Sequence, residues 1–279
     1  MKRKKRIGTA AKAVGCAVLL MISLFPIYWL LAMAIRPTDE MRGHIALIPQ
    51  SLTGMHFAQL FTSENFGQAI MNSLQTTFGS LIISLLAGIC AAYVIARRRF
   101  RFGLKKPMTY WVLLVRVLPP VAFTIPLYIM FNRLGVLNTK LPVMLACVLI
   151  NVPLIIWFLI SFFQDLPEEI EESAKVDGAT EWQLFRKIVL PLVAPGIAAV
   201  SMLSFMYAWN EYTYTVIFTR IPANNTVPLA LALLNTEDNL TNFGLVAAGG
   251  VISVIPITLF VIFAHNYLIS GLSSGAVKE

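Results

Sequence analysis

Long apolar stretches separated by short polar ones run the whole length of the chain, and this pattern predicts a set of membrane-spanning helices. A helix needs about 20 mostly apolar residues to cross the hydrocarbon core of a bilayer. Six stretches meet that length, and they cover residues 13–35, 71–96, 108–131, 142–163, 196–218 and 244–269. We therefore expect an all-α membrane protein in which residues 1–279 form a single transmembrane domain.

Prolines inside these stretches predict kinks. Pro26 lies in the first stretch, Pro119, Pro120 and Pro126 lie in the third, and Pro256 lies in the last. Proline is tolerated inside a span where neighbouring helices or side chains satisfy the backbone groups that it frees.

The first stretch also has features of a secretory signal. Lysines and arginines fill positions 2–6, and Ala32-Met33-Ala34 resembles a cleavage site. The apolar run at 14–35 is longer than the roughly 7–15 residues of a signal peptide. We therefore expect an uncleaved first helix.

The composition agrees with an integral membrane protein. Hydrophobic residues make up 57% of the chain and charged residues 13%, with a mean hydropathy of +0.73. Soluble domains are nearer half apolar and a quarter charged. The net charge of +8 would suggest a nucleic-acid partner for a soluble protein, but here the bases flank apolar stretches, so membrane orientation explains them.

Basic residues gather in alternate loops, and this asymmetry predicts the orientation of the chain. They are dense before the first stretch. They are also dense between the second and third, at Arg97, Arg98, Arg99, Arg101, Lys105 and Lys106. The positive-inside rule then places both termini and the loop 164–195 in the cytoplasm, and the loops 37–70 and 219–243 outside.

The sequence lacks motifs for catalysis or cofactor binding. It has no G-x-x-x-x-G-K-[ST] phosphate loop, no H-E-x-x-H and no G-x-S-x-G. Its three histidines are scattered, and its three cysteines lie in apolar segments where packing explains them. We expect no catalytic, metal-binding or cofactor-binding residues and no enzyme activity in this chain.

One charged segment, EESAKVDGATEWQLFRKIVLPLVAP at residues 171–195, follows the fourth apolar stretch. The pattern predicts two short helices. Asp165 is placed to cap the first, with Pro167 in its first turn and Glu168 at the capping-box position.

The rest of the segment carries further local signals. Gly178 permits a tight turn between the two helices, and Thr180 with Gln183 repeats the capping-box pattern. Glu171 and Lys175 have the i,i+4 spacing of a favourable ion pair.

Helices this short are marginal alone and need a surface to pack on. Trp182, Phe185 and Val189 fall on one face of the second helix. A solvated connector on the membrane surface is one interpretation. A second interpretation is that a helix of this segment enters a groove of a partner protein. The small residues beside the acids favour it, because small side chains allow close approach. These residues are Ser173, Ala174, Gly178 and Ala179.

The segment resembles the EAA loop of binding-protein-dependent ABC importer permeases. The family pattern of E-A-A, three residues and G is matched by Glu172, Ser173, Ala174 and Gly178, with serine in place of the first alanine. Other motifs resemble the carbohydrate branch of that family, of the maltose-importer type. They are NSL at 72–74, AAYVIARRRF at 91–100, RVLPPVAFTIPLY at 116–128, D-G-A at 177–179 and AWNEY at 208–212.

The resemblance implies the fold and role of a type I ABC importer permease that moves a sugar or sugar derivative across the bacterial cytoplasmic (inner) membrane. Besides lipid, its implied partners are a second related permease, two ATPase subunits that bind ATP and Mg, and an extracytoplasmic sugar-binding protein. The charged loop would be a coupling helix seated in an ATPase groove. Its ATPase-coupling residues would be Glu172, Ser173, Ala174, Asp177, Gly178 and Ala179.

Ionisable residues inside apolar spans are costly and indicate either function or pairing. Arg116 lies in the third stretch, and Asn210 and Glu211 lie in the fifth. They would line a translocation path or gate, or they would form a structural network. Helical rise places Arg116 and Glu211 at similar depths in the membrane, so we also expect them to pair in at least one transport state.

A second class of function is a stand-alone secondary transporter or channel for a small polar solute. It would need acidic residues in the spans to couple ion movement, and Glu211 alone is available. It would also leave the charged segment without a role. The sequence therefore favours the importer permease.

Overall fold

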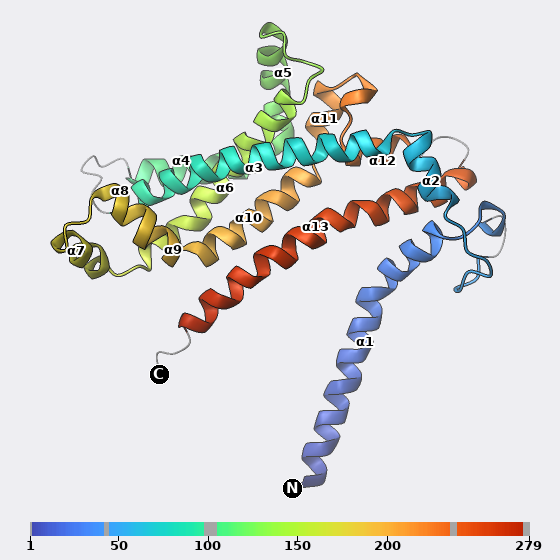
Figure 1. The fold of residues 1–279 in the computed structure, drawn as a ribbon, viewed down its shortest axis with the longest axis horizontal. Coiled ribbons are helices and arrows are strands. Elements are labelled where there is room, and N and C mark those ends of the chain that lie inside the picture. The colour runs from blue at the N-terminus through green and yellow to red at the C-terminus, as the bar shows by residue number, and fades with distance from the viewer. Residues whose placement is uncertain (1, 42–44, 98–104, 235–238, 276–279) are drawn as a thin grey trace. The chain divides into compact units, whose positions relative to one another are not determined.

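The computed structural model describes residues 2–41, 45–97, 105–234 and 239–275, with side chains at 12–41, 45–97, 107–234 and 243–264. In these ranges every regular element is helical (Figure 1). The main helices are α1 (Lys2–Ala34), α2 (Met55–Thr62), α3 (Phe66–Ala96), α4 (Lys105–Val117), α5 (Thr124–Arg133), α6 (Leu141–Gln164), α7 (Glu168–Val176), α8 (Glu181–Leu184), α9 (Leu190–Leu192), α10 (Ala194–Trp209), α11 (Thr213–Phe218), α12 (Val227–Leu233) and α13 (Asn239–Gly275). Shorter helical turns are η1 (Thr38–Met41), η2 (Pro120–Phe123), η3 (Phe185–Val189) and η4 (Pro222–Asn224).

Four of the described helices have segments long and apolar enough to cross a membrane. These segments are Lys12–Ala34, Phe66–Ala96, Leu141–Gln164 and Phe243–Ala264. Two bent pairs, Pro107–Val117 with Pro120–Arg133 and Glu181–Leu192 with Ala194–Trp209, bring the number to six if each is one span. The all-helical fold class is confirmed.

The third apolar stretch is broken where the sequence predicted a kink. The helix axes on either side of Pro119 and Pro120 differ by 99°. By contrast, α1 and α13 continue past Pro26 and Pro256 as single helices.

The fifth stretch, 196–218, is two helices rather than one. α10 has 16 residues and ends at Trp209, and α11 begins at Thr213. At the helical rise α10 is about 24 Å long, shorter than a hydrocarbon core of about 30 Å. Hydropathy does not register this break, because the residues that follow it are again mostly apolar.

The chain divides into two compact units, and the smaller comprises Met1–Gly67 and Ala230–Val254. His56 is buried, its Nε2 atom lies 3.0 Å from the Arg36 carbonyl, and its ring lies against Gly244. The carboxylate of Glu40 accepts hydrogen bonds from the Ser51 hydroxyl and from the Ser51 and Gln50 backbone N–H groups. The hydroxyl bond is the largest cause that lowers the pKa of Glu40.

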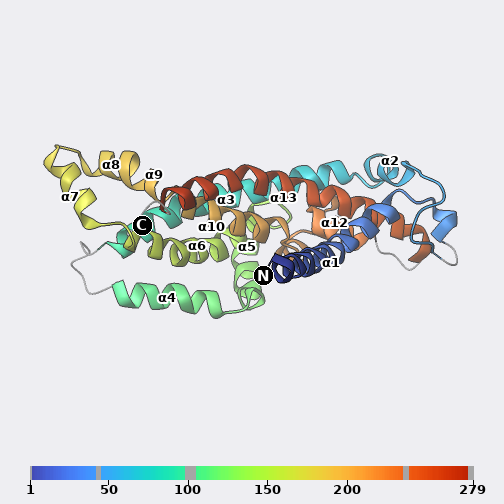
Figure 2. The same cartoon turned by 90° about the horizontal axis from the view of Figure 1, so that it is seen from below.

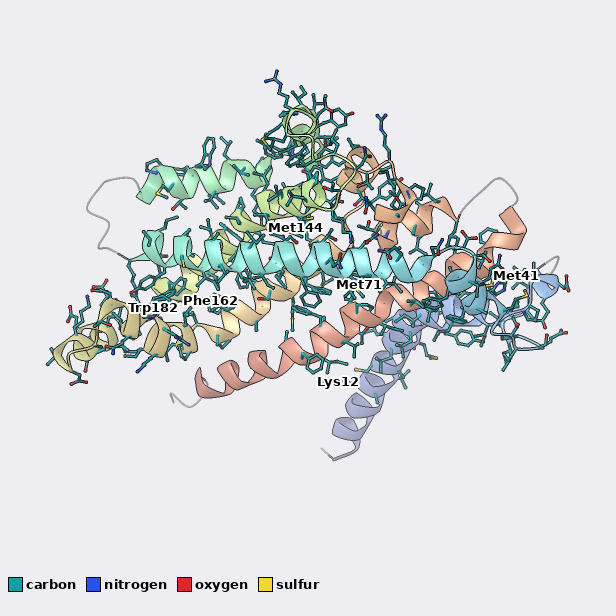
Figure 3. All side chains as sticks on the ribbon, turned by 45° about the horizontal axis from the view of Figure 1, so that its top comes forward. Lys12, Met41, Met71, Met144, Phe162 and Trp182 are labelled. Atoms are coloured by element: carbon teal, nitrogen blue, oxygen red, sulfur yellow. The ribbon has the colours of Figure 1, made fainter. Side chains whose placement is uncertain are left out.

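The larger unit comprises Gln68–Leu229 and Ile255–Glu279, and α6 lies against α4, α10 and α11 within it. Three side chains on one face of α6 fill places left open by glycines. Met144 lies against Gly79 and Ile155 against Gly88, both on α3, and Phe162 lies against Gly196 on α10 (Met144 and Phe162 are labelled in Figure 3). The spacings of 11 and 7 residues are close to three and two helical turns, which places all three side chains on one face.

The start of α3 is tied to the loop before α12. The Asn72 amide donates hydrogen bonds to the carbonyls of Ala223 and Asn225, at 2.8 and 2.9 Å. The Ser73 hydroxyl accepts one from the Val227 N–H at 2.8 Å. The NSL motif therefore has a structural role here, because it satisfies backbone groups of an irregular segment.

The glycine contacts predict which substitutions the helix packing tolerates. A Cβ atom at Gly88 would lie 2.6 Å from Ile155 Cγ2, and one at Gly196 would lie 2.6 Å from the Phe162 ring. We expect Gly88→Ala and Gly196→Ala each to cost about 1–3 kcal/mol of stability through overpacking, measured as a lower thermal unfolding midpoint in detergent. Gly15→Ala is the control, since nothing lies within 4 Å of that position. An equal shift for all three variants would contradict the packing argument.

Candidate functional site

The charged segment forms a helical hairpin of α7, α8, η3 and α9 at one end of the larger unit (Figures 1 and 2). The prediction that Asp165 caps α7 is wrong. Asp165 ends α6 in a helical conformation, and its N–H donates to the Ser161 carbonyl. Pro167 takes the N-cap position of α7, and its side chain forms no capping hydrogen bond. Glu168 stays in the first turn, where the helix dipole favours an acid.

The turn after α7 confirms the role predicted for Gly178. Its φ of +83° lies in the left-handed region that side chains resist. The Gly178 N–H donates to the Lys175 carbonyl, and the Ala179 N–H donates to the Ala174 carbonyl, each at 3.0 Å. This pair of bonds is a Schellman motif, which satisfies the last carbonyls of α7.

The capping box predicted for the second helix is present. The Gln183 N–H donates to the Thr180 hydroxyl at 3.3 Å, and the Thr180 N–H donates to the Gln183 side chain at 2.9 Å. η3 then forms one π-helical turn, and such turns are frequent at functional sites.

Apolar contacts attach this hairpin to the ends of α3 and α6. Ala174, Leu184 and Val189 are buried in one cluster with residues that include Ile95 of α3 and Phe163 of α6. The Phe185 ring lies 5.0 Å from the Tyr93 ring, centroid to centroid, and so adds an aromatic contact to α3.

Charged contacts also differ from those that the spacing predicted. Glu171 does not pair with Lys175. Glu171 Oε1 instead lies 2.7 Å from Arg97 Nε, and both side chains are more than 90% buried. Lys175 pairs with Glu181 at the surface. In the sequence analysis, Arg97 served only as one of the basic residues that indicate membrane orientation. Its pairing with Glu171 could not be predicted there, because no local spacing connects two residues that are 74 positions apart.

The predicted coupling residues separate into a buried and an exposed set. Ala174 is buried inside the protein and Ala179 is half-buried, so Ala174 does not belong to an outer docking surface. The exposed members are Glu172, Ser173, Asp177 and Gly178.

Large apolar side chains on the hairpin also face outward, and Val176 and Trp182 are the most exposed of them. Val176 is 87% exposed and Trp182, labelled in Figure 3, is 64% exposed. Burial therefore varies along the expected apolar face of the second helix. Val189 is buried, Phe185 is half-buried, and Trp182 packs beside the Phe185 ring at 6.0 Å while its remaining surface is open.

Glu211 lies in the break between α10 and α11. Its carboxylate accepts hydrogen bonds from the Tyr214 N–H at 2.6 Å, from the Thr215 N–H at 3.1 Å and from the Thr215 hydroxyl at 3.0 Å. It therefore satisfies the first donors of α11, where the helix dipole also favours a negative charge. These contacts favour the structural interpretation of Glu211.

Arg116 lies at the end of α4, beside the other break. Its guanidinium carbon lies 4.5 Å from the centroid of the Trp157 ring, a cation–π contact. It borders a cavity of about 210 Å³ that is also lined by Pro120, Pro153 and Tyr207. Asn210 is exposed, and its amide donates to the Met206 carbonyl at 2.8 Å.

The expected direct pairing of Arg116 with Glu211 is not seen in this conformation, because each group has the other contacts just described. The two breaks are nevertheless connected. The Tyr214 hydroxyl donates to the Pro120 carbonyl at 2.8 Å, and the Tyr214 N–H binds Glu211. The sequence analysis did not identify Tyr214, because a tyrosine in an apolar stretch gives no sign that it connects two helix breaks.

Comparison with known proteins places this architecture in a family. The family model described as "Binding-protein-dependent transport system inner membrane component" matches residues 84–274. The chain is 32% identical to the trehalose transport system permease protein SugB of Mycobacterium tuberculosis, over 92% of this chain and 93% of that protein. It is also 32% identical to the arabinooligosaccharides transport system permease protein AraQ of Halalkalibacterium halodurans, over the full length of both.

The fold agrees with these matches. A chain from the crystal structure of a bacterial ABC transporter involved in import of the acidic polysaccharide alginate superposes with a TM-score of 0.78. The two chains are 20% identical, and the match covers 95% of this chain and 98% of the other. This protein therefore belongs to the family of binding-protein-dependent transport system inner membrane components, the membrane subunits of ABC importers.

Proposed function

We propose that this chain is the permease subunit of an ATP-driven importer that moves a sugar or sugar derivative across the cytoplasmic membrane. The observation that carries the proposal is full-length similarity to permeases whose names specify carbohydrates. These are trehalose, arabinooligosaccharides and diacetylchitobiose, each at 32% identity over more than 90% of this chain. The sugar that this protein moves belongs to the same broad class.

The hairpin supplies the contact with the ATPase subunits in this proposal. A water-facing loop that leaves Val176 and Trp182 widely exposed while it buries Leu184 and Val189 presents a surface for a partner. Tryptophan is enriched at such contacts. Glu172 and Asp177 lie close in sequence to Val176 and Trp182 and add negative charge to this surface. The surface therefore fits a groove lined by basic residues. ATP and Mg are bound by those partner subunits.

The remaining partners are a second related permease and an extracytoplasmic sugar-binding protein. Two observations support them. A second solved structure with this fold is an alginate transporter in complex with a periplasmic protein that carries an alginate pentasaccharide, with a TM-score of 0.70 and 19% identity. In addition, residues 12–28 of the first span are all exposed within this chain, so lipid or a second subunit covers them.

For the translocation path, Asn210 and Arg116 are the stronger candidates in this chain. Both are exposed in the larger unit, and Arg116 borders the cavity at the broken third span. A charged residue at membrane depth faces a polar cavity or a partner rather than lipid. Glu211 remains a candidate for a gate, because its bonds hold the break beside Asn210.

The first prediction tests the function. Co-expressed with its ATPase and partner permease, the chain should co-purify with ATPase activity, and vesicles with the complex should take up a sugar only with ATP. Glu172→Lys should reduce uptake at least tenfold through a reversed charge on the docking surface. Glu169→Lys, an exposed acid on the same helix outside the E-A-A pattern, is the control. Uptake without any ATPase would support a stand-alone transporter and refute the proposal.

The second prediction concerns orientation. In a variant without native cysteines, Lys187→Cys on the hairpin should react with a membrane-impermeant reagent only from the cytoplasmic side. Ala223→Cys, in the exposed loop before α12, should react only from outside. Both positions are exposed, so lack of access does not explain a negative result. The reverse labelling pattern would contradict the positive-inside orientation.

The third prediction separates Glu211 from Asn210. Glu211→Ala removes the three bonds at the start of α11 and should lower stability by about 0.5–2 kcal/mol, as for other helix caps. Asn210→Ala should leave the unfolding midpoint nearly unchanged and, if Asn210 lines the path, should raise the sugar concentration needed for half-maximal uptake. Equal stability of the two variants would be evidence against the capping role of Glu211.

A further inference from the structure

A buried ion pair joins the hairpin to the end of α3. Arg97 follows the last residue of α3, and its Nε atom lies 2.7 Å from Glu171 Oε1 on α7. A second nitrogen of the same guanidinium, Nη1, donates to the Leu166 carbonyl at 3.2 Å, in the link between α6 and α7. One side chain therefore contacts α7 and the segment that leads into it.

The burial of this pair gives it a mechanical property that the surrounding apolar contacts lack. Apolar contacts such as that of Ala174 with the ends of α3 and α6 are non-directional, so they permit small sliding movements. A buried charge that loses its partner is energetically costly. Separation of α7 from α3 is therefore strongly opposed at this point.

The other ion pair of the hairpin provides a contrast. Lys175 and Glu181 join α7 to α8 within the hairpin, with side-chain exposures of 31% and 68%. Exposed pairs are screened by water and salt and contribute little. This pair does not reach α3. Arg97–Glu171 therefore connects the hairpin to a membrane helix, whereas Lys175–Glu181 acts inside it.

We propose that the Arg97–Glu171 ion pair transmits movement of the hairpin to α3, so that the two move as one body during transport. The proposal rests on the proposed function, since the movement originates at the ATPase contact. Arg97 is then a positioning residue: it touches neither sugar nor nucleotide and acts by holding Glu171. Without the pair, the hairpin still binds the ATPase, but α3 no longer follows it.

The test measures the distance between the hairpin and α3 in the assembled complex. Spin labels at Glu169→Cys on α7 and Leu86→Cys on α3, both exposed positions outside the proposed ATPase contact, report it in a variant without native cysteines. The intact pair should give one narrow distance distribution, unchanged between the nucleotide-free state and the state trapped with ATP, Mg and vanadate. Arg97→Gln and Glu171→Gln should broaden it and shift its mean on trapping. The charge exchange Arg97→Glu with Glu171→Arg should restore a single narrow distribution.

Two controls separate this role from general effects of charge. Lys175→Gln breaks the exposed pair, and Arg186→Gln removes one exposed positive charge from the same hairpin. Both should keep the narrow distribution, and all variants should retain ATPase subunits and basal ATP hydrolysis within about twofold. Glu171→Gln is nearly isosteric and serves if Arg97→Gln does not fold.

The outcomes distinguish this inference from the proposed function. A complex that binds its ATPases, and in which Arg97→Gln and Glu171→Gln keep the narrow, unchanged distribution, overturns the inference and leaves the function intact. Loss of the narrow distribution in the Lys175→Gln control also overturns it, because the effect would then not depend on burial. A wild-type chain that recruits no ATPase refutes the proposed function itself.

Discussion

Close contact between α6 and its neighbours is the constraint on which the larger unit depends. Lipid is as apolar as a leucine side chain, so helices in a membrane are held together by van der Waals packing and hydrogen bonds rather than by exclusion from water. Met144, Ile155 and Phe162 meet that requirement by occupying spaces at Gly79, Gly88 and Gly196. The same helix ends beside Phe163, which packs against the hairpin. The packing that holds the membrane helices thus also supports the candidate coupling site.

The hairpin is ordered by its own chain before any partner arrives. Its helices are too short to be stable alone, but a Schellman motif ends α7, a capping box begins α8, and Leu184 and Val189 are buried. A partner that binds Val176 and Trp182 therefore meets a preformed surface, and little conformational entropy is lost on docking. A preformed hairpin also transmits force, which a flexible loop would absorb.

The sequence predicted those features that depend on neighbouring residues. The Gly178 turn, the Thr180–Gln183 capping box and the break at Pro119 and Pro120 are local and were all found. The ion pair of Glu171 could not be predicted from spacing, because only the tertiary fold brings Arg97 against Glu171, while Lys175 pairs with Glu181. The break after Trp209 was also missed, although Asn210-Glu211-Tyr212 is the polar signal that marks it.

The two broken spans show why the charges at membrane depth differ in role. Backbone that leaves the helix inside a membrane must be satisfied by protein or must line a cavity. Glu211 binds the free donors of α11, and Tyr214, held in that turn, donates its hydroxyl proton to the Pro120 carbonyl in the other break. The structure thus links the two breaks through a neutral tyrosine instead of the expected Arg116–Glu211 pair. Arg116 is left on the Trp157 ring at the border of the cavity, without a part in satisfying the backbone. Since Glu211 already has a structural task and Arg116 has none of this kind, the physical case for a role in transport is stronger for the arginine.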